Sequence, residues 1–350
     1  MAGLHRLLAL LALALGSVAV SEAEDRAKNA ELRSLPCPDP QDISPCVCTV
    51  DLQHSMDIDC SQVESEDQLA QAFSSYIPFP HFHALYISGN QHLKILRNGD
   101  LGPASFERIY ITGGVLEEVQ DEALSQSYPT ASHIDFQANN VSTFPFHELP
   151  LFTSLVYLQL RSNSFESFPV LNSDTLQEIV LNGNLFGEIP LDGFRGVKNL
   201  YHISVSGNDV EILRPGTFTN LPHLRYLSLE NNQITDIPAG TIEFSGGGGS
   251  SLLLQNNNIK SIATGSITGI NTGHIYLTKN SLVVLEEGVF RPFLDGGATL
   301  NVDENPLGCG CDLAWLITNS NFMALTSPAA SCYDGELLTS LDPTIYADLC

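Results

Sequence analysis

The chain has 350 residues, of which 40 are Asp or Glu and 15 are Lys or Arg, so its formal net charge at pH 7 is −25. Nucleic acids and anionic membrane surfaces repel such a chain, and we expect neither as a partner.

The first 23 residues have the pattern of a secretory signal peptide. One basic residue, Arg6, precedes an apolar run from Leu7 to Val20, and Ser21 and Ala23 fit the small-residue cleavage pattern. This run is shorter than the roughly 20 apolar residues that span a bilayer. We therefore expect cleavage after residue 23, an N-terminal segment over 24–36, and a secreted, extracellular protein with no membrane partner.

All 8 cysteines follow this segment and form two groups, one near each end of the chain. A secreted chain oxidises its thiols, which argues against a zinc site. The single residue between Cys309 and Cys311 also argues against zinc, because paired ligands are usually two to four residues apart. We expect two disulfides in an N-terminal cap over 37–75 and two in a C-terminal cap over 308–350, and sequence alone allows three pairings in each group. The groups are Cys37, Cys46, Cys48 and Cys60, and Cys309, Cys311, Cys332 and Cys350.

Residues 76–307, between the caps, consist of ten repeats. One copy reads Leu155-x-x-Leu158-x-Leu160-x-x-Asn163-x-Phe165, which is the leucine-rich repeat template. The Asn-type positions recur every 21 to 25 residues, and Gly114 replaces the Asn of the second repeat. A single repeat cannot bury its apolar residues, whereas stacked repeats share a continuous core. The pattern predicts an α/β leucine-rich repeat solenoid, a horseshoe with a parallel sheet along its concave side.

The run Gly246–Gly249 has the composition of an engineered linker. The spacing from Asn232 to Asn257 is nevertheless that of the other repeats, whereas an inserted linker would lengthen it. We interpret the run as a natural loop of its repeat.

The sequence carries no recognised catalytic motif: it has no H-E-x-x-H, G-x-S-x-G, phosphate loop or dinucleotide fingerprint. Three histidines, His133, His202 and His274, share one strand position. They belong to the third, sixth and ninth repeats, so about 14 Å separates successive ones at the usual strand spacing, and they cannot share a metal ion. We expect a non-enzyme with no cofactor and no metal site.

The strand positions that point away from the core form a candidate protein-binding face. Five of the ten tyrosines fall in two columns of this face. Exposed aromatic side chains with polar tips are typical interface anchors, although a concave sheet also tolerates them without a partner. We expect a binding role centred on Tyr157, His202 and Tyr226. The candidate residues are Tyr86, Arg108, Tyr110, His133, Tyr157, His202, Tyr226, His274 and Tyr276.

Asn140-Val141-Ser142 is a glycosylation sequon directly after a repeat Asn, where the chain leaves the predicted strand. In a secreted protein we expect a glycan on Asn140.

The cysteine patterns resemble the caps of extracellular leucine-rich repeat proteins. In the C-terminal group the pattern is C-x-C-x20-C-x17-C, and the resemblance implies the pairs Cys309–Cys332 and Cys311–Cys350. For the N-terminal group it implies Cys37–Cys48 and Cys46–Cys60. The segment "DLAWLI" that follows Cys311 is then expected to be a short helix across the last repeat.

The N-terminal cap resembles one family more specifically. The segments "CPDPQDISPCVCTVD", "MDIDCS" and "VESEDQLAQAF" are similar to arthropod secreted leucine-rich repeat proteins typified by the non-catalytic subunit of Oplophorus luciferase (Oplophorus-luciferin 2-monooxygenase). The resemblance implies a non-catalytic accessory subunit that binds and stabilises a small coelenterazine-oxidising luciferase subunit in a bioluminescent hetero-oligomer. The alternative is an extracellular recognition or adhesion protein of innate immunity or of the matrix, with no link to a luciferase.

Overall fold

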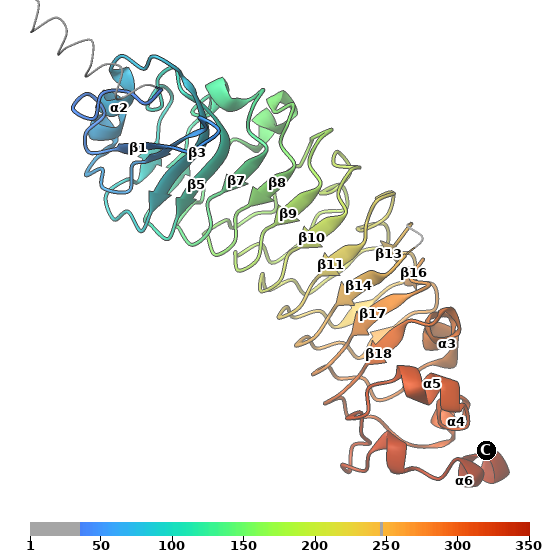
Figure 1. The fold of residues 1–350 in the computed structure, drawn as a ribbon. Coiled ribbons are helices and arrows are strands. Elements are labelled where there is room, and N and C mark those ends of the chain that lie inside the picture. The colour runs from blue at the N-terminus through green and yellow to red at the C-terminus, as the bar shows by residue number, and fades with distance from the viewer. Residues whose placement is uncertain (1–35, 246–247) are drawn as a thin grey trace, which may run out of the picture.

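The computed structural model describes residues 36–245 and 248–350. The predicted signal peptide, all but the last residue of the segment 24–36, and residues 246 and 247 of the glycine run lie outside the described residues. The described chain is a curved stack, with the N-terminal cap at one end and the helices of the C-terminal cap at the other (Figure 1). In this part of the chain no helix combines the length and the apolar character needed to cross a membrane.

One twelve-stranded sheet runs along the whole stack, and it confirms the predicted solenoid with a parallel sheet. Strand β1 (Val47–Val50) pairs antiparallel with β2 (Met56–Asp59), and every later pair in the sheet is parallel. The ten remaining strands coincide with the ten repeated segments. They are β3 (His81–Ser88), β5 (Ser105–Thr112), β7 (His133–Asp135), β8 (Tyr157–Gln159), β9 (Glu178–Val180), β10 (His202–Ser204), β11 (Tyr226–Ser228), β14 (Ser250–Leu253), β17 (Gly273–Tyr276) and β18 (Thr299–Asn301).

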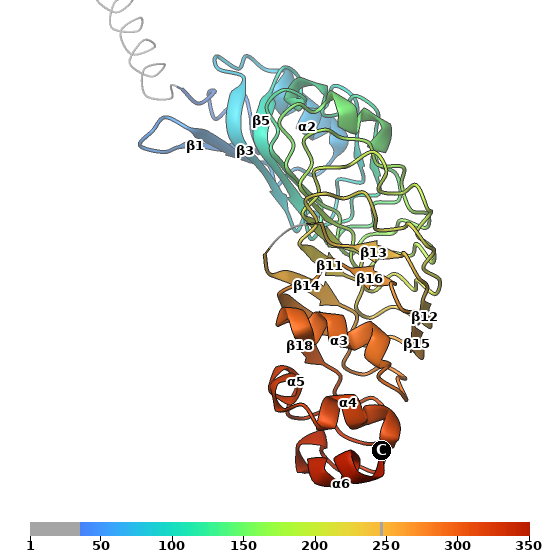
Figure 2. The same ribbon diagram turned by 90° about the vertical axis from the view of Figure 1, so that its right-hand side faces the viewer.

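The opposite, convex side of the stack is formed by the return segments of the repeats. Figure 2 shows short strands of this side, β12 and β15, across the stack from β11 and β14. The paired short strands are β4 (Ile95–Leu96) with β6 (Glu118–Val119), β12 (Asp236–Ile237) with β15 (Ser261–Ile262), and β13 (Ile242–Glu243) with β16 (Ile267–Thr268). Other returns form the 3-10 helices η1 (Ser125–Ser127) and η2 (Phe146–Leu151) and the helix α3 (Glu287–Gly296).

A row of phenylalanine rings fills the middle of the stack on its convex half. Neighbouring rings in this row have centroids 4.9 to 6.5 Å apart, mostly in edge-to-face or tilted arrangements, which aromatic pairs prefer. Phe146 and Phe168 are partly buried and the other rings are buried, and full burial of one such side chain contributes about 1.5–3 kcal/mol. The rings belong to Phe136, Phe144, Phe146, Phe165, Phe186, Phe168, Phe194 and Phe218.

Buried asparagines join each repeat to the one before it. The Nδ2 atom of Asn163 donates to the carbonyl of Leu160 in its own repeat, at 3.0 Å, and to that of Phe136 in the preceding repeat, at 2.9 Å. Its Oδ1 atom accepts from the N–H of Val141, also in the preceding repeat, at 2.9 Å. Each bond satisfies a buried backbone group that would otherwise be unpaired. The asparagine ladder comprises Asn90, Asn139, Asn163, Asn184, Asn208, Asn232, Asn257, Asn280 and Asn305.

The exception at Gly114 has a steric cause. A Cβ atom at this position would lie 2.6 Å from the carbonyl oxygen of Asn90 and 3.0 Å from Oδ1 of Asn139. No side chain fits there. Asn139 instead accepts from the N–H of Gly114 at 3.1 Å and donates to the carbonyl of Ile111 at 2.7 Å, so the next ladder residue satisfies the second repeat.

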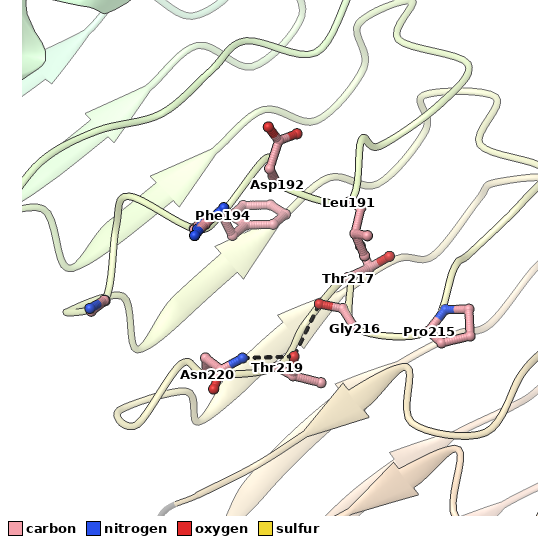
Figure 3. A pocket seen from close by; sticks show the side chains of 10 residues that line it. Leu191, Asp192, Phe194, Pro215, Gly216, Thr217, Thr219 and Asn220 are labelled. Atoms are coloured by element: carbon pink, nitrogen blue, oxygen red, sulfur yellow. Dashed lines mark hydrogen bonds between the residues drawn. The ribbon is translucent and has the colours of Figure 1, made fainter.

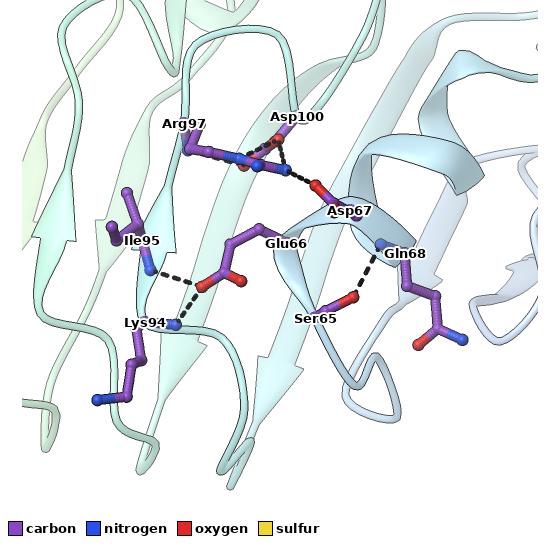
Figure 4. Close-up of polar contacts among 8 residues, drawn as sticks. All are labelled: Ser65, Glu66, Asp67, Gln68, Lys94, Ile95, Arg97 and Asp100. Atoms are coloured by element: carbon purple, nitrogen blue, oxygen red, sulfur yellow. Dashed lines mark hydrogen bonds and ion pairs between the residues drawn. The ribbon is translucent and has the colours of Figure 1, made fainter.

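In the N-terminal cap, helix α2 (Glu66–Ser74) is attached to the first repeat by its own first turn. Ser65 accepts from the N–H of Gln68 as the N-cap, and the Glu66 carboxylate accepts from the N–H groups of Lys94 at 2.9 Å and Ile95 at 3.2 Å (Figure 4). Burial acts to raise the pKa of Glu66, but the backbone donors outweigh it and hold this pKa below its ordinary value.

Four disulfides lie in the two caps: Cys37–Cys48 and Cys46–Cys60 at the N-terminal end, and Cys309–Cys332 and Cys311–Cys350 at the C-terminal end. The C-terminal cap contains the 3-10 helices η3 (Cys311–Leu313) and η4 (Leu338–Ser340) and the helices α4 (Ala314–Ile317), α5 (Ser320–Leu325) and α6 (Pro343–Leu349). The indole Nε1 of Trp315 in α4 donates to the carbonyl of Leu285 at 3.1 Å, which fixes the cap to the last repeats.

Candidate protein-binding face

The sheet face is the outward surface of the twelve-stranded sheet, and strand alternation decides which side chains reach it. In β8, Leu158 is fully buried while Tyr157 and Gln159 on either side are partly exposed. Parallel pairing in register places Tyr157 directly beside His133, and His133 beside Arg108. Outward residues of successive repeats therefore form columns across the strands.

Strands β3, β5, β7 and β8 lie side by side in the sheet (Figure 1). One side chain from each of them joins an aromatic ladder, which consists of Tyr86, Tyr110, His133 and Tyr157. The ring centroids are 5.1 Å apart for Tyr86–Tyr110, 5.1 Å for Tyr110–His133 and 4.2 Å for His133–Tyr157, with nearly parallel planes in the first and last pairs. Tyr86 and Tyr110 are register partners, as are His133 and Tyr157, so their separations follow from the strand spacing of about 4.8 Å. Tyr110 instead contacts His133 diagonally, because the register pairs Tyr110 with Asp135. All four side chains are half-buried by one another, so the ladder is ordered before any partner arrives.

The Tyr157 hydroxyl at the end of the ladder is surrounded by polar groups. Gln159 donates from Nε2 to the hydroxyl of Tyr157 at 3.1 Å. Burial raises the pKa of Tyr157, and the nearby charges of Asp135 and Glu178 raise it further. Burial also raises the pKa of Asp135, although the N–H and side-chain amide of Gln137 donate to this carboxylate and oppose the shift.

A carboxylate interrupts the aromatic surface after Tyr157. In the sheet register Glu178 lies between Tyr157 and His202, whose ring contacts Tyr226 at a centroid distance of 4.3 Å. The three residues expected at the centre of the face therefore do not form one contiguous aromatic patch. The hydroxyl of Tyr201 donates to Glu178, and this bond, followed by burial, raises the pKa of Tyr201 to about 12.

The remaining candidates are Arg108, which lies beside the aromatic ladder, and two residues of β17. Arg108 is exposed beside His133, and it supplies positive charge next to the ladder. His274 and Tyr276 lie far along the sheet, on β17, with a ring-centroid distance of 5.9 Å, and Nδ1 of His274 is 2.7 Å from the hydroxyl of Thr299. They form a separate small group and do not extend the aromatic ladder.

Acid is expected to weaken the folded state through the half-buried histidines of this face. Burial lowers the pKa of His133, with a further contribution from Arg108, and burial lowers the pKa of His202 against the opposing charge of Glu178. As pH falls, these histidines are therefore protonated in the unfolded chain before they are protonated in the folded protein. The stability that the neutral histidines contribute is present above pH ~6.5 and is lost as pH falls below that value. Urea unfolding at pH 7.5 and 5.0 should show a smaller acid-induced loss for His133→Gln than for the wild type.

The exposed His223 supplies the matched control for this experiment. His223→Gln should keep the wild-type loss of stability between pH 7.5 and 5.0, and an equal loss in His133→Gln would contradict the prediction.

Asn140 is exposed and follows the buried Asn139 of the asparagine ladder. Its N–H donates to the carbonyl of Leu116 at 2.9 Å, which leaves the side chain free of the backbone ladder. Glycosylation of this residue stays a prediction.

A wide cavity of about 740 Å³ lies on the convex side, between the return segments of two neighbouring repeats (Figure 3). Its polar groups include Asp192, Arg195 and Lys198, and the Thr219 hydroxyl donates to the carbonyl of Gly216 at 3.1 Å. No Ser, His or Cys is among the described residues that line it. We do not assign the binding role to this cavity.

Comparisons with known proteins agree with this architecture. A family model described as "Leucine rich repeat" matches residues 174–234. The non-catalytic subunit of Oplophorus-luciferin 2-monooxygenase from Oplophorus gracilirostris is 35% identical over 317 residues, which cover 90% of this chain and 88% of that protein. Tsukushi from Gallus gallus is 30% identical over 119 residues, or 34% of this chain and 32% of that protein.

Among solved structures, a chain from an octameric complex of Latrophilin 3, Unc5D and the leucine-rich repeats of FLRT2 matches with a TM-score of 0.68. The match covers 84% of this chain and 97% of that chain at 19% sequence identity, which is a likeness of fold alone.

Proposed function

Because this chain belongs to the family of leucine-rich repeat proteins that includes the non-catalytic subunit of Oplophorus-luciferin 2-monooxygenase, we propose that it is a secreted, non-catalytic accessory subunit. Its partner in this proposal is a small coelenterazine-oxidising luciferase subunit, which it binds and stabilises. The similarity supports this role because it extends over nearly the whole length of both proteins and is not limited to the repeats.

The aromatic ladder on the sheet face is the observation that carries the proposal. A stable interface buries about 800 Å² on each partner and uses about 20–30 residues, a number that the outward columns of ten strands and their flanks can supply. Tyrosines at the centre of such a surface contribute much of the binding energy. Since Tyr86, Tyr110, His133 and Tyr157 are already stacked, little side-chain entropy is lost on binding.

Binding alone is sufficient for the accessory role. A protein that binds only the folded form of its partner stabilises that form by mass action, by about 2.7 kcal/mol when its concentration is 100 times the Kd. No residue of this chain then needs to contact coelenterazine or oxygen. The expected result is a longer lifetime of light output, with the chemical step left to the partner.

Removing the ladder is expected to abolish this effect. The mature chain from residue 24, expressed with a small coelenterazine-oxidising luciferase subunit, should co-purify with it and lengthen the half-life of its luminescence. The double variant Tyr110→Ala/Tyr157→Ala should weaken the Kd by at least ~30-fold, because truncation of one central tyrosine costs about 2 kcal/mol or more. Binding is measured by titration calorimetry and luminescence by its decay at constant temperature.

Tyr333, which is 76% exposed in the C-terminal cap, is the matched control, and Tyr333→Ala should bind as the wild type does. Unchanged binding by the ladder variant would place the interface elsewhere on the solenoid. A wild-type chain that neither binds the subunit nor alters its light output would end the luciferase proposal. Extracellular recognition or adhesion would then lead, and capture of partners from the source animal's secretions would follow.

A further inference from the structure

A group of three metal-ligand side chains lies on the convex side, far from the aromatic ladder. Asp121 follows strand β6 in the return of the second repeat, and His147 and Glu148 belong to helix η2 in the return of the third. Each offers one ligand atom, and these three atoms lie within 4.8 Å of one another. Among the described residues, no other three His, Cys, Asp or Glu side chains come together in this way.

Glu148 is the buried member of this group, and one of its two carboxylate oxygens has no hydrogen-bond partner among the described residues. The residue is only 5% exposed. Its Oε1 atom accepts from the N–H of Glu122 at 2.7 Å, whereas its buried Oε2 atom has no hydrogen-bond partner in the described part of the chain. The hydroxyl of Tyr128 lies beside this carboxylate, and burial followed by the Glu148 carboxylate raises the pKa of this hydroxyl. The contact does not have hydrogen-bond geometry, so neither the hydroxyl nor Oε2 has a hydrogen bond within the described chain. A buried carboxylate oxygen without a partner is costly, and a bound cation removes that cost.

An ion pair within the group does not meet this need. His147 Nε2 is 3.7 Å from Asp121 Oδ1, but both side chains are about 70% exposed, at 68% and 71%. Such exposed pairs contribute little to stability, and this one leaves Oε2 of Glu148 without a hydrogen bond. Because these two side chains are exposed, an ion from solvent can reach them, and Glu148 offers that ion one carboxylate oxygen from the buried side.

The donor set selects the metal. Ca²⁺ and Mg²⁺ prefer sites made only of oxygen ligands, whereas an imidazole nitrogen suits Zn²⁺ and its first-row neighbours. Zn²⁺ holds nitrogen and oxygen ligands at about 2.0–2.2 Å in a tetrahedron, which places two ligand atoms about 3.4 Å apart. The 3.7 Å between Nε2 of His147 and Oδ1 of Asp121 is close to this value. We propose that Asp121, His147 and Glu148 bind one Zn²⁺ ion, with water completing its coordination.

The bound ion would connect two neighbouring repeats on the side of the stack opposite the sheet. Its ligands come from consecutive return segments, which are also joined by the bond from the Glu122 N–H to Glu148 and by the bond from the Val119 N–H to the carbonyl of Thr143. Zinc binding to the folded state alone then raises the free energy of unfolding by mass action. The site is therefore structural in this proposal, and it is independent of partner binding at the sheet face.

The test uses the mature full-length chain, stripped with EDTA and titrated calorimetrically with ZnCl₂, CaCl₂ and MgCl₂ at pH 7.5. We expect one Zn²⁺ site with a Kd in the micromolar range or below, a higher Tm with zinc, and no comparable binding of Ca²⁺ or Mg²⁺. His147→Ala, at an exposed position, should fold normally and weaken this site by at least ~10-fold. Glu148→Gln keeps the acceptor for the Glu122 N–H and should have the same effect.

His92, exposed in the first repeat, is the matched control, and His92→Ala should retain the wild-type site. The proposal is overturned if the wild-type chain binds no Zn²⁺ in this range. It is also overturned if folded His147→Ala binds Zn²⁺ with unchanged stoichiometry and affinity.

Discussion

Gly269→Ala should destabilise the protein by more than about 4 kcal/mol or prevent its folding, whereas Gly265→Ala should cost only about 1–2 kcal/mol. Both glycines have a left-handed backbone, with φ of 79° and 72°, so an alanine is strained equally at either site. They differ in their surroundings. A Cβ atom at Gly269 would collide with the carbonyl of Phe244 in the preceding repeat, while a Cβ atom at Gly265 would meet nothing within 4 Å.

Urea unfolding followed by circular dichroism measures the loss of unfolding free energy in each variant. Because the backbone strain is the same in both, the difference between the two losses is the cost of the collision. The collision is with backbone and not with the end of a flexible side chain, so only a separation of the two repeats can relieve it. Equal stability losses in the two variants would show that these repeats move apart at little cost, contrary to the close packing of the stack.

The second large effect is expected in the asparagine ladder. The Nδ2 atom of Asn257 donates to the carbonyls of Leu229 and Leu254, both at 3.0 Å, and its Oδ1 atom accepts from the N–H of Ile234 at 3.1 Å. Asn257→Ala leaves these three buried backbone groups unpaired, each at a cost of about 1–3 kcal/mol. We expect a loss of about 3–5 kcal/mol in the free energy of unfolding, because water entering the space left behind restores part of the bonding.

The next residue supplies the control. Asn258 is exposed, and only its backbone N–H takes part in the ladder, where it donates to the carbonyl of Ile234 at 3.0 Å. Asn258→Ala should therefore lie within about 0.5 kcal/mol of the wild type in the same urea titration. If the two variants were equally stable, the role assigned to the buried amide would be wrong.

The repeats could be predicted from sequence because each repeat forms one layer of the stack, so residues at equivalent positions recur at nearly constant spacing. The position of each strand and the columns of outward residues follow from the Asn-to-Asn spacing alone. The same register already places Glu178 between Tyr157 and His202, so the break in the aromatic surface was open to prediction. Tyr201 was missed because it precedes strand β10 and lies outside the two columns, although its hydroxyl reaches Glu178.

Other features depend on distances that no periodicity encodes. The orientation of the rings of Tyr86, Tyr110 and His133 decides whether they stack, and their positions alone do not fix it. Gly114 departs from the template because the Asn90 carbonyl comes close to it. The group around Glu148 lies in return segments, outside the repeated strand pattern, and the burial of one carboxylate among exposed ones is a property of the folded state.

The asparagine ladder also sets the order in which the repeats complete their hydrogen bonds during synthesis. Each ladder residue satisfies groups of the repeat before it, as Asn163 does for Phe136 and Val141. A ribosome releases the chain from its N-terminal end, so every newly made repeat completes its predecessor and has its own polar groups open until the next one follows. During synthesis, the repeat with unpaired backbone groups is thus always the one made last. The C-terminal cap is made after all the repeats, and Trp315 of this cap donates to the carbonyl of Leu285. Folding of the cap therefore completes the stack.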